Sequence, residues 1–362
     1  MFYDRIRRTQ MALKQTDNDF ILICDRENLI YYTGITEIEC GALIIEPEGI
    51  PTLVTLWLDI PFFKQKIDYP IVGYIFGKET LGSKVCDLLK KKGYKDPKIL
   101  FSKYFIEVGV YESLRKNFQN MTVANGTEFF YKIRSIKDKT ELDYIRKASD
   151  IVVKGMESVV DAIQPGMTES EVLGIAEMSM RKAGSEGHPF RMQVLNEERQ
   201  AMVHPHALDT TLHNNQYVVV LIGACYKGYV SKITRSIALG KVSPEKEDTY
   251  HLMHQAQKAA IAASKPGTPV QEVYHAAYRV IDEAGYGKHL IDAIGYGIGI
   301  RQSEFYPVIN KNGSHVLEKG MAVDMIFPTL YHPVKAGPRI LDVVFVDDEP
   351  EVVTQFEDFP KK

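Results

Sequence analysis

The chain has 362 residues, of which 45% are hydrophobic and 25% charged, and its formal net charge is −3. This composition is ordinary for a globular protein with room for two cored domains, and the weak charge gives no case for binding nucleic acid or a membrane surface. No apolar run approaches the roughly 20 residues of a membrane helix. The polar first ten residues and four scattered cysteines favour a cytoplasmic protein with reduced thiols.

The first half of the chain predicts a mixed α/β domain. An amphipathic helix is expected over residues 3–15. Short apolar runs typical of strands follow it, at residues 20–24, 29–32, 42–45 and 52–55. The pattern then predicts a helix, a strand and a helix, at residues 83–92, 98–101 and 107–117. Residues 131–137 are interpreted as a short connector, so the first domain is placed at residues 1–130.

The second half, residues 131–362, opens with a long periodic helix over residues 139–162. Thr168 and Glu171 form a capping-box pattern that starts a helix reaching about residue 183. Two further helices and two strands are expected after it, at residues 244–265, 270–284, 322–327 and 343–346. These elements predict a second, α+β domain.

The histidines are confined to the second domain, since all ten lie at or after His188. His204 and His206 alternate, so on an extended segment they point to one face. Imidazole titrates near neutral pH, which suits His204 to general acid or base chemistry and His206 to orienting a substrate. The alternative is a pair of polar loop histidines.

Five short segments occur in the order found in one known family. They are residues 29–34 (LIYYTG), 133–141 (IRSIKDKTE), 165–169 (PGMTE), 221–224 (LIGA) and 232–235 (KITR). Together they resemble the creatinase/aminopeptidase P/prolidase family. The resemblance implies an α/β N-terminal domain, an α+β C-terminal domain of the "pita-bread" type, and a homodimer.

The resemblance also implies two metal ions, held in the family by two Asp, one His and two Glu. The positions that match those ligands hold Leu221, Lys232, Tyr296, Phe327 (or Ile326, if the match shifts by one residue) and Leu341. Leucine has no lone pair to give a metal, and an ammonium repels a divalent cation. We therefore expect no metal and no other cofactor in this site.

Three residues are predicted to carry chemistry in place of the metals. His204 matches the position of the catalytic histidine in creatinase-type members and would manage the proton. Lys232 would bind a substrate carboxylate or stabilise developing negative charge, although it could instead neutralise nearby acids such as Glu304. Tyr296 would donate a hydrogen bond, or else only fill the vacated space.

A wider set is predicted to contact substrate: His206, Tyr229, Glu304, Arg339, Glu37 and Glu39. Arg339 is a candidate bidentate clamp for a carboxylate, with a structural ion pair as the equal alternative. Tyr229 is expected to form scaffold or substrate wall. Glu37 and Glu39 are candidates for reaching the neighbouring subunit's site in a dimer, and a solvated strand edge is their simpler interpretation.

Three functions remain open at this point. The favoured one is a metal-independent hydrolase or lyase acting on a C–N bond of a small polar, zwitterionic molecule. The second is a non-enzymatic protein that binds a peptide or small ligand in the cleft where the family's members hold their metals. An ordinary Xaa-Pro aminopeptidase or dipeptidase is the least favoured, because without metals the chain lacks a means of making hydroxide at pH 7.

Overall fold

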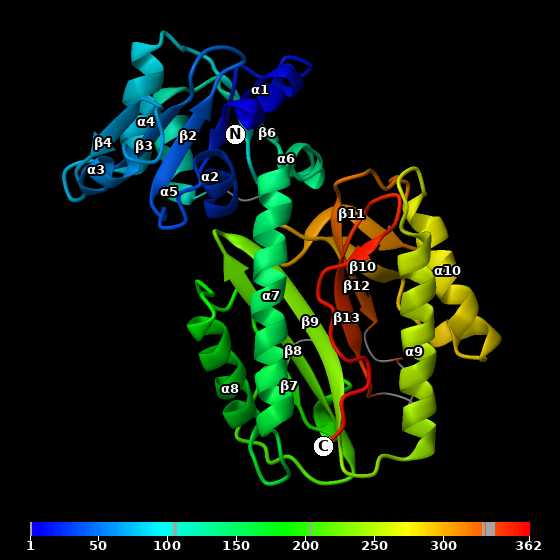
Figure 1. The fold of residues 1–362 in the computed structure, drawn as a ribbon. Helices are drawn as coiled ribbons and strands as arrows, with labels where there is room; N and C mark the ends of the chain where they lie inside the picture. The colour runs from blue at the N-terminus through cyan, green and yellow to red at the C-terminus, as the bar shows by residue number, and fades with distance from the viewer. Residues whose placement is uncertain (1, 104–106, 203–204, 328–329, 331–336) are drawn as a thin grey trace. The chain divides into compact units, whose positions relative to one another are not determined.

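A computed structural model describes residues 2–103, 107–202, 205–327, 330 and 337–362. The chain forms two compact units, residues 1–133 and 134–362, and each is described by itself below (Figure 1). The boundary lies three residues after the position expected from the sequence. In the described residues no helix is long and apolar enough to cross a membrane.

The first unit is built on a six-stranded sheet with strand order β4-β3-β2-β1-β5-β6. The strands are β1 (Phe20–Ile23), β2 (Gly41–Ile45), β3 (Thr52–Leu56), β4 (Ile71–Tyr74), β5 (Lys98–Phe101) and β6 (Thr122–Asn125). The helices are α1 (Phe2–Leu13), α2 (Arg26–Thr33), α3 (Ile60–Phe63), α4 (Leu81–Lys91) and α5 (Val108–Asn117), with the 3-10 turn η1 (Trp57–Asp59). Strands β1 and β2 are buried along their whole length, as expected for the centre of a covered sheet.

The apolar run at residues 29–32 is helical, so the strand expected there is wrong. Asp25 caps α2 by accepting the Asn28 N–H, and Gly34 ends the helix in the left-handed conformation with φ of 67°. All of residues 28–33 are buried. A helix buried on every side shows no amphipathic period, and a short run of this kind cannot be told from a strand by pattern alone.

The connector expected at residues 131–137 is also largely helical, because α6 covers Thr127–Ser135. Asn125 supports the start of this helix by accepting hydrogen bonds from the Thr127 N–H and hydroxyl. The helix contains the boundary between the two units. A helical connector needs no glycine or proline, which is why turn signals did not reveal it.

The second unit is built on an eight-stranded sheet whose main path runs β11-β10-β12-β13-β9-β8-β7, with β14 paired to β13. Its strands are β7 (Gln193–Leu195), β8 (Gln216–Tyr226), β9 (Tyr229–Leu239), β10 (Ala293–Gly297), β11 (Glu304–Asn310), β12 (Ala322–Phe327), β13 (Ile340–Phe345) and β14 (Glu351–Val352). Its helices are α7 (Lys139–Ala162), α8 (Glu169–Lys182), α9 (Pro244–Ala263) and α10 (Val270–Glu283), with the 3-10 turns η2 (Glu197–Arg199) and η3 (Gly287–His289).

The helices pack on the sheet in two groups, each over its own core. Helix α7 packs on β8 and β9, while α9 packs on β12 and β13 and α10 on β11 (Figure 1). Val220, Ile222 and Ile233 belong to the core under α7 and α8. Val323 and Met325 belong to the core under α9 and α10. This arrangement of helices on a curved antiparallel sheet is the expected pita-bread architecture.

Candidate active site

The other face of this sheet, called here the inner face, carries Leu221, Lys232 and Leu341, three of the positions that the resemblance assigns to metal ligands. Successive strand residues point to opposite faces, so residues that alternate with the helix-covered cores lie on the inner face. These inner-face residues are Leu221, Lys232, Thr234, Asp324, Leu341 and Val343. The sheet therefore brings together on one surface positions that are up to 122 residues apart in the chain.

Four inner-face positions form one row across the sheet. Tyr296 of β10 is in register with Asp324 of β12, and Asp324 is in register with Val343 of β13. Leu341 of β13 pairs with Thr234 of β9, and continuing this antiparallel register places Val343 opposite Lys232. Directly opposite residues on antiparallel strands share a face. Lys232, Val343, Asp324 and Tyr296 are therefore neighbours in that order.

A buried ion pair joins two members of this row. The Lys232 Nζ lies 2.5 Å from Asp324 Oδ2, and the lysine also donates to Ser303 Oγ at 3.5 Å. Asp324 is fully buried and Lys232 is 7% exposed. The ammonium expected from the sequence is therefore in place, but its strongest partner is an aspartate of β12.

Asp324 contacts Tyr296 as well as Lys232. Its Oδ1 accepts the Tyr296 N–H at 2.9 Å. Burial raises the pKa of the Asp324 carboxyl, and Lys232 and the Tyr296 N–H offset that rise only in part. Burial, with the nearby Asp324 charge second, also raises the pKa of the Tyr296 phenol. At neutral pH the tyrosine is therefore a neutral hydrogen-bonding group, and its ring meets Phe305 edge-on with centroids 5.8 Å apart.

Glu304 lies beside a different pair of cations. Its carboxylate is 3.0 Å from Arg134 and 3.3 Å from Lys137, and all three side chains are buried. Burial opposes ionisation, but Arg134 and then Lys137 outweigh it and hold the pKa of Glu304 below its usual value. The suggested pairing of Glu304 with Lys232 is wrong, because the β11 carboxylate is satisfied by residues at the entry to α7.

Arg339 and Tyr229 also face protein groups. The Arg339 guanidinium donates to Gln193 Oε1 at 3.0 Å, to the Met202 carbonyl at 2.7 Å and to the Gln200 carbonyl. These three acceptors are neutral protein groups, and both the carboxylate clamp and the structural ion pair stay predictions for Arg339. The Tyr229 hydroxyl donates to Glu141 at 3.0 Å inside the core, which agrees with a scaffold role.

The remaining predicted residues lie at the surface or outside the described residues. His204 is among the latter. His206 is exposed, and its carbonyl accepts from Arg199 at 2.8 Å. Glu37 and Glu39 are exposed in a loop rather than alternating on a strand edge, and Glu37 pairs with Lys66 at 3.2 Å. Within the second unit, the structure therefore brings Lys232 and Tyr296 together around Asp324.

Asp324 was missed by sequence reasoning. It stands alone among apolar residues in the strand AVDMIF. Such an isolated carboxylate at an inward position requires a buried partner, and Lys232 was the complementary unexplained charge. Matching the two would have predicted the pair.

The residues of the inner face do not fit the dinuclear metal centre that the fold family implies. Leu221 and Leu341 offer no donor atom, and Lys232 brings a positive charge that Asp324 already neutralises. Across the described parts of the chain, no group of three or more His, Cys, Asp or Glu side chains is placed to hold a metal ion.

Comparison with known proteins decides the family. Residues 143–348 match the profile of metallopeptidase family M24, and residues 5–136 match the creatinase/prolidase N-terminal domain. The chain belongs to family M24. It is similar in structure to an Xaa-Pro dipeptidase from Bacillus anthracis, with 26% identity, full coverage of both chains and a TM-score of 0.91. It also resembles the prolidase from Pyrococcus horikoshii OT3, with 25% identity, 98% and 99% coverage and a TM-score of 0.89.

Curated relatives of this M24 chain include an uncharacterized peptidase of Staphylococcus aureus strain MW2, which is 35% identical over 227 residues. The match covers 62% of this chain and 64% of the relative. The chain thus spans less than two thirds of the curated relatives it matches. The comparisons confirm the expected family and fold class.

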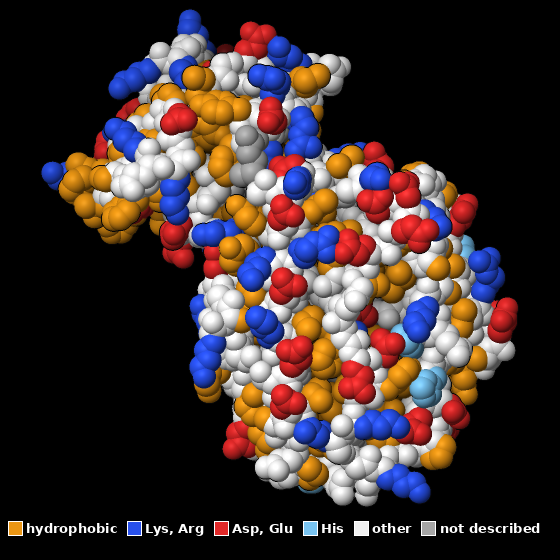
Figure 2. Space-filling view, in the orientation of Figure 1, with side chains coloured by type: hydrophobic (Ala, Val, Ile, Leu, Met, Phe, Trp, Pro, Cys, Tyr) orange, Lys and Arg blue, Asp and Glu red, His pale blue; other side chains and the backbone are white. Residues whose placement is uncertain are grey.

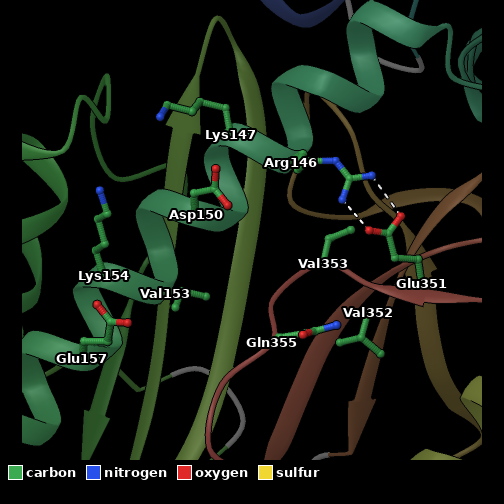
Figure 3. A pocket seen from close by; sticks show the side chains of 10 residues that line it. All are labelled: Arg146, Lys147, Asp150, Val153, Lys154, Glu157, Glu351, Val352, Val353 and Gln355. Atoms are coloured by element: carbon green, nitrogen blue, oxygen red, sulfur yellow. Dashed lines mark hydrogen bonds and ion pairs between the residues drawn. The ribbon is translucent and has the colours of Figure 1, made fainter.

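A separate surface cavity of about 510 Å³ lies along α7 of the M24 unit (Figure 3). Its walls are the exposed side of α7 and the segment around β14, where Arg146 and Glu351 form a two-pronged ion pair. Charges of both signs line it, namely Lys147, Asp150, Lys154 and Glu157. It contains none of the predicted site residues, so we place the candidate site on the inner face and not here.

Proposed function

We propose that this M24 protein hydrolyses an amide or related C–N bond in a small peptide-like substrate, without a dinuclear metal centre. The observation that carries the proposal is the Lys232–Asp324 pair, which puts a fixed cation at a position that the resemblance assigns to a metal ligand. Family membership and the names of the relatives support hydrolysis of a peptide-like molecule.

In this proposal His204 takes a proton from water as the oxygen attacks the carbonyl carbon. The same proton is returned to the leaving nitrogen when the C–N bond breaks. Lys232 and the Tyr296 hydroxyl supply positive charge and a hydrogen bond toward the developing oxyanion. A histidine base contributes typically about 10²–10⁴-fold to the rate. Such chemistry suits a bond more labile than an ordinary peptide bond.

A second candidate is a peptidase-like protein that binds a peptide or small ligand and does not cleave it. The burial of the inner face favours this candidate, since Asp324, Leu341 and Val343 have no solvent exposure. An ion pair that satisfies itself leaves less charge for a transition state than a free ammonium would. Binding would then use the half-buried groups at the rim, including Leu221, Tyr296 and Ser303.

The third candidate is the metal-dependent Xaa-Pro dipeptidase activity that two relatives' names suggest. It requires donors that Leu221, Lys232 and Leu341 do not provide. The structural likeness of the whole chain supports it, and the chemistry of the inner face opposes it. Metal content therefore separates this candidate from the first two.

One experiment tests all three candidates. Protein purified without chelators is analysed for Mn, Co, Zn and Fe, then assayed on Xaa-Pro dipeptides and on small amide, amidine and guanidine compounds, with and without EDTA. The proposal expects turnover that EDTA leaves unchanged and that His204→Ala lowers about 10²–10⁴-fold. Saturable ligand binding without turnover, preserved in His204→Ala, would support the second candidate. Near-stoichiometric metal with EDTA-sensitive dipeptide cleavage would overturn the proposal in favour of the third.

A further inference from the structure

The Lys232–Asp324 pair crosses an intervening strand. Strand β13 lies between β9, which carries Lys232, and β12, which carries Asp324. Neighbouring strands are about 4.7–4.9 Å apart, so the two backbones are separated by roughly 10 Å. A lysine extends over the small Val343 side chain and closes that gap, whereas an aspartate at position 232 could not. The pair therefore joins two strands that share no hydrogen bonds with each other.

The buried Asp324 carboxylate also requires a cation beside it. This aspartate is fully buried on the inner face and its neighbours along β12 are apolar. An ionised carboxylate in such a place is stable only beside a cation or several hydrogen-bond donors. The structure supplies one N–H, from Tyr296, and one ammonium, from Lys232. The ammonium thus carries the electrostatic part of the site's stability.

We propose that the Lys232 ammonium is a covalently attached substitute for the cations of a dinuclear centre, with Asp324 as its counter-charge. The pair holds β9 and β12 together across β13, so the inner face keeps its shape without metal. The pair keeps the site intact whether or not the protein is a hydrolase.

Replacing the lysine by an acid gives a direct test. Lys232→Asp removes the ammonium and leaves two carboxylates facing the same space, which should favour a divalent cation. We expect the unfolding temperature of Lys232→Asp to fall below that of the wild type, and to rise by at least about 2 °C when millimolar MnCl2 is added. The wild type should respond neither to MnCl2 nor to EDTA.

Apolar substitutions at positions 232 and 324 test the same ion pair if Lys232→Asp does not fold. Lys232→Met and Asp324→Leu, each alone, leave one buried charge without its partner, and removing one partner of a buried pair is strongly destabilising. We expect each single variant to raise the unfolding equilibrium constant at least a hundredfold, and the double variant to recover most of that loss. Lys361→Met, at an exposed pair with Glu247, is the matched control and should change little.

The readouts are thermal and chemical unfolding, with hydrogen exchange of peptides from β9 and β12 to localise the effect. Additive losses in the double variant would overturn the proposal, because the two side chains would then act independently. A wild-type protein stabilised by MnCl2 and destabilised by EDTA would also overturn it. Neither outcome depends on finding a substrate, so a failure here is distinct from a failure of the proposed function.

Discussion

At the scale of single residues, the second unit contains several buried pairs of oppositely charged side chains. Lys232 meets Asp324 on the inner face, and Glu304 meets Arg134 and Lys137 at the entry to α7. Arg235 meets Asp342 at 2.9 Å on the helix-covered face. Removing one partner of a buried ion pair leaves the other charge buried without compensation, so we expect each such mutation to be strongly destabilising.

Glu304→Gln should lower the free energy of unfolding of the second unit by about 3–5 kcal/mol, the range for removing one partner of a buried ion pair. The change leaves Arg134 and Lys137 buried without a full counter-charge. Chemical denaturation followed by far-UV circular dichroism measures the effect. Glu247→Gln, at the exposed pair with Lys361, is the matched control and should change stability by less than about 1 kcal/mol. A Glu304 effect no larger than that of the control would contradict the prediction.

Glu304 should also make stability depend on pH. Its pKa is lower in the folded protein than in the unfolded chain, so the folded state binds its proton less readily. The stabilisation is complete above the unfolded value of about 4.3 and is lost as pH falls through the folded pKa. Denaturation midpoints between pH 3 and pH 6 measure this loss. Glu304→Gln should flatten the acid limb, and an identical acid limb in the variant would refute the assignment.

At the scale of elements, local capping explains why several predicted helices begin where they do. Thr168 accepts the Glu171 N–H and Glu171 accepts the Thr168 N–H, which forms the capping box at the start of α8. Asp138 and Glu141 form the same box at the start of α7. These contacts lie within four residues, so the sequence reveals them without tertiary information.

Thr168→Ala should therefore destabilise the second unit by about 1 kcal/mol, the usual value for losing an N-cap oxygen. Urea denaturation at neutral pH provides the measurement. Ser170→Ala, an exposed change two residues further into α8, serves as control and should stay within about 0.5 kcal/mol of the wild type. Equal effects at the two positions would show that the cap does not set the start of the helix.

At the scale of the whole molecule, one surface of the first unit is unusually apolar. Hydrophobic side chains gather over η1, α3 and the end of β4 (Figure 2). Phe76 is 85% exposed and Phe62 68%, with Trp57, Leu58 and Ile75 exposed beside them. Exposed aromatic clusters of this kind mark interaction sites. The homodimer expected from the sequence remains a prediction, and this patch is the place to test it.

Phe62→Glu combined with Phe76→Glu should convert a dimer to a monomer while leaving the unfolding temperature of the second unit unchanged, because buried charge at an apolar interface is unfavourable. Size-exclusion chromatography with light scattering measures the mass. Met178→Glu introduces the same charge at an exposed methionine of the second unit and should leave the mass unaltered. A wild-type protein that is already monomeric at micromolar concentration would sink this prediction.

The sequence by itself determined the family, the two-domain order and most element positions, since these depend on short segments, periodicity and local caps. It also predicts that Leu221, Lys232 and Leu341 stand where the family has metal ligands, because a missing donor is visible in residue type alone. The sequence-based prediction was wrong for α2, because a helix buried on every side has no amphipathic period. It was also wrong for α6, because a helical connector carries no turn signal.

Only the tertiary structure decided which charge meets which. Lys232 and Asp324 are 92 residues apart in the chain. Lys232 pairs with Asp324 and not with Glu304, because β9 and β12 lie on either side of β13 and only the Val343 side chain separates the two residues. Glu304 instead faces Arg134 and Lys137. Pairing between distant strands depends on sheet order and register, which fix the direction of every side chain but leave no local mark in the chain.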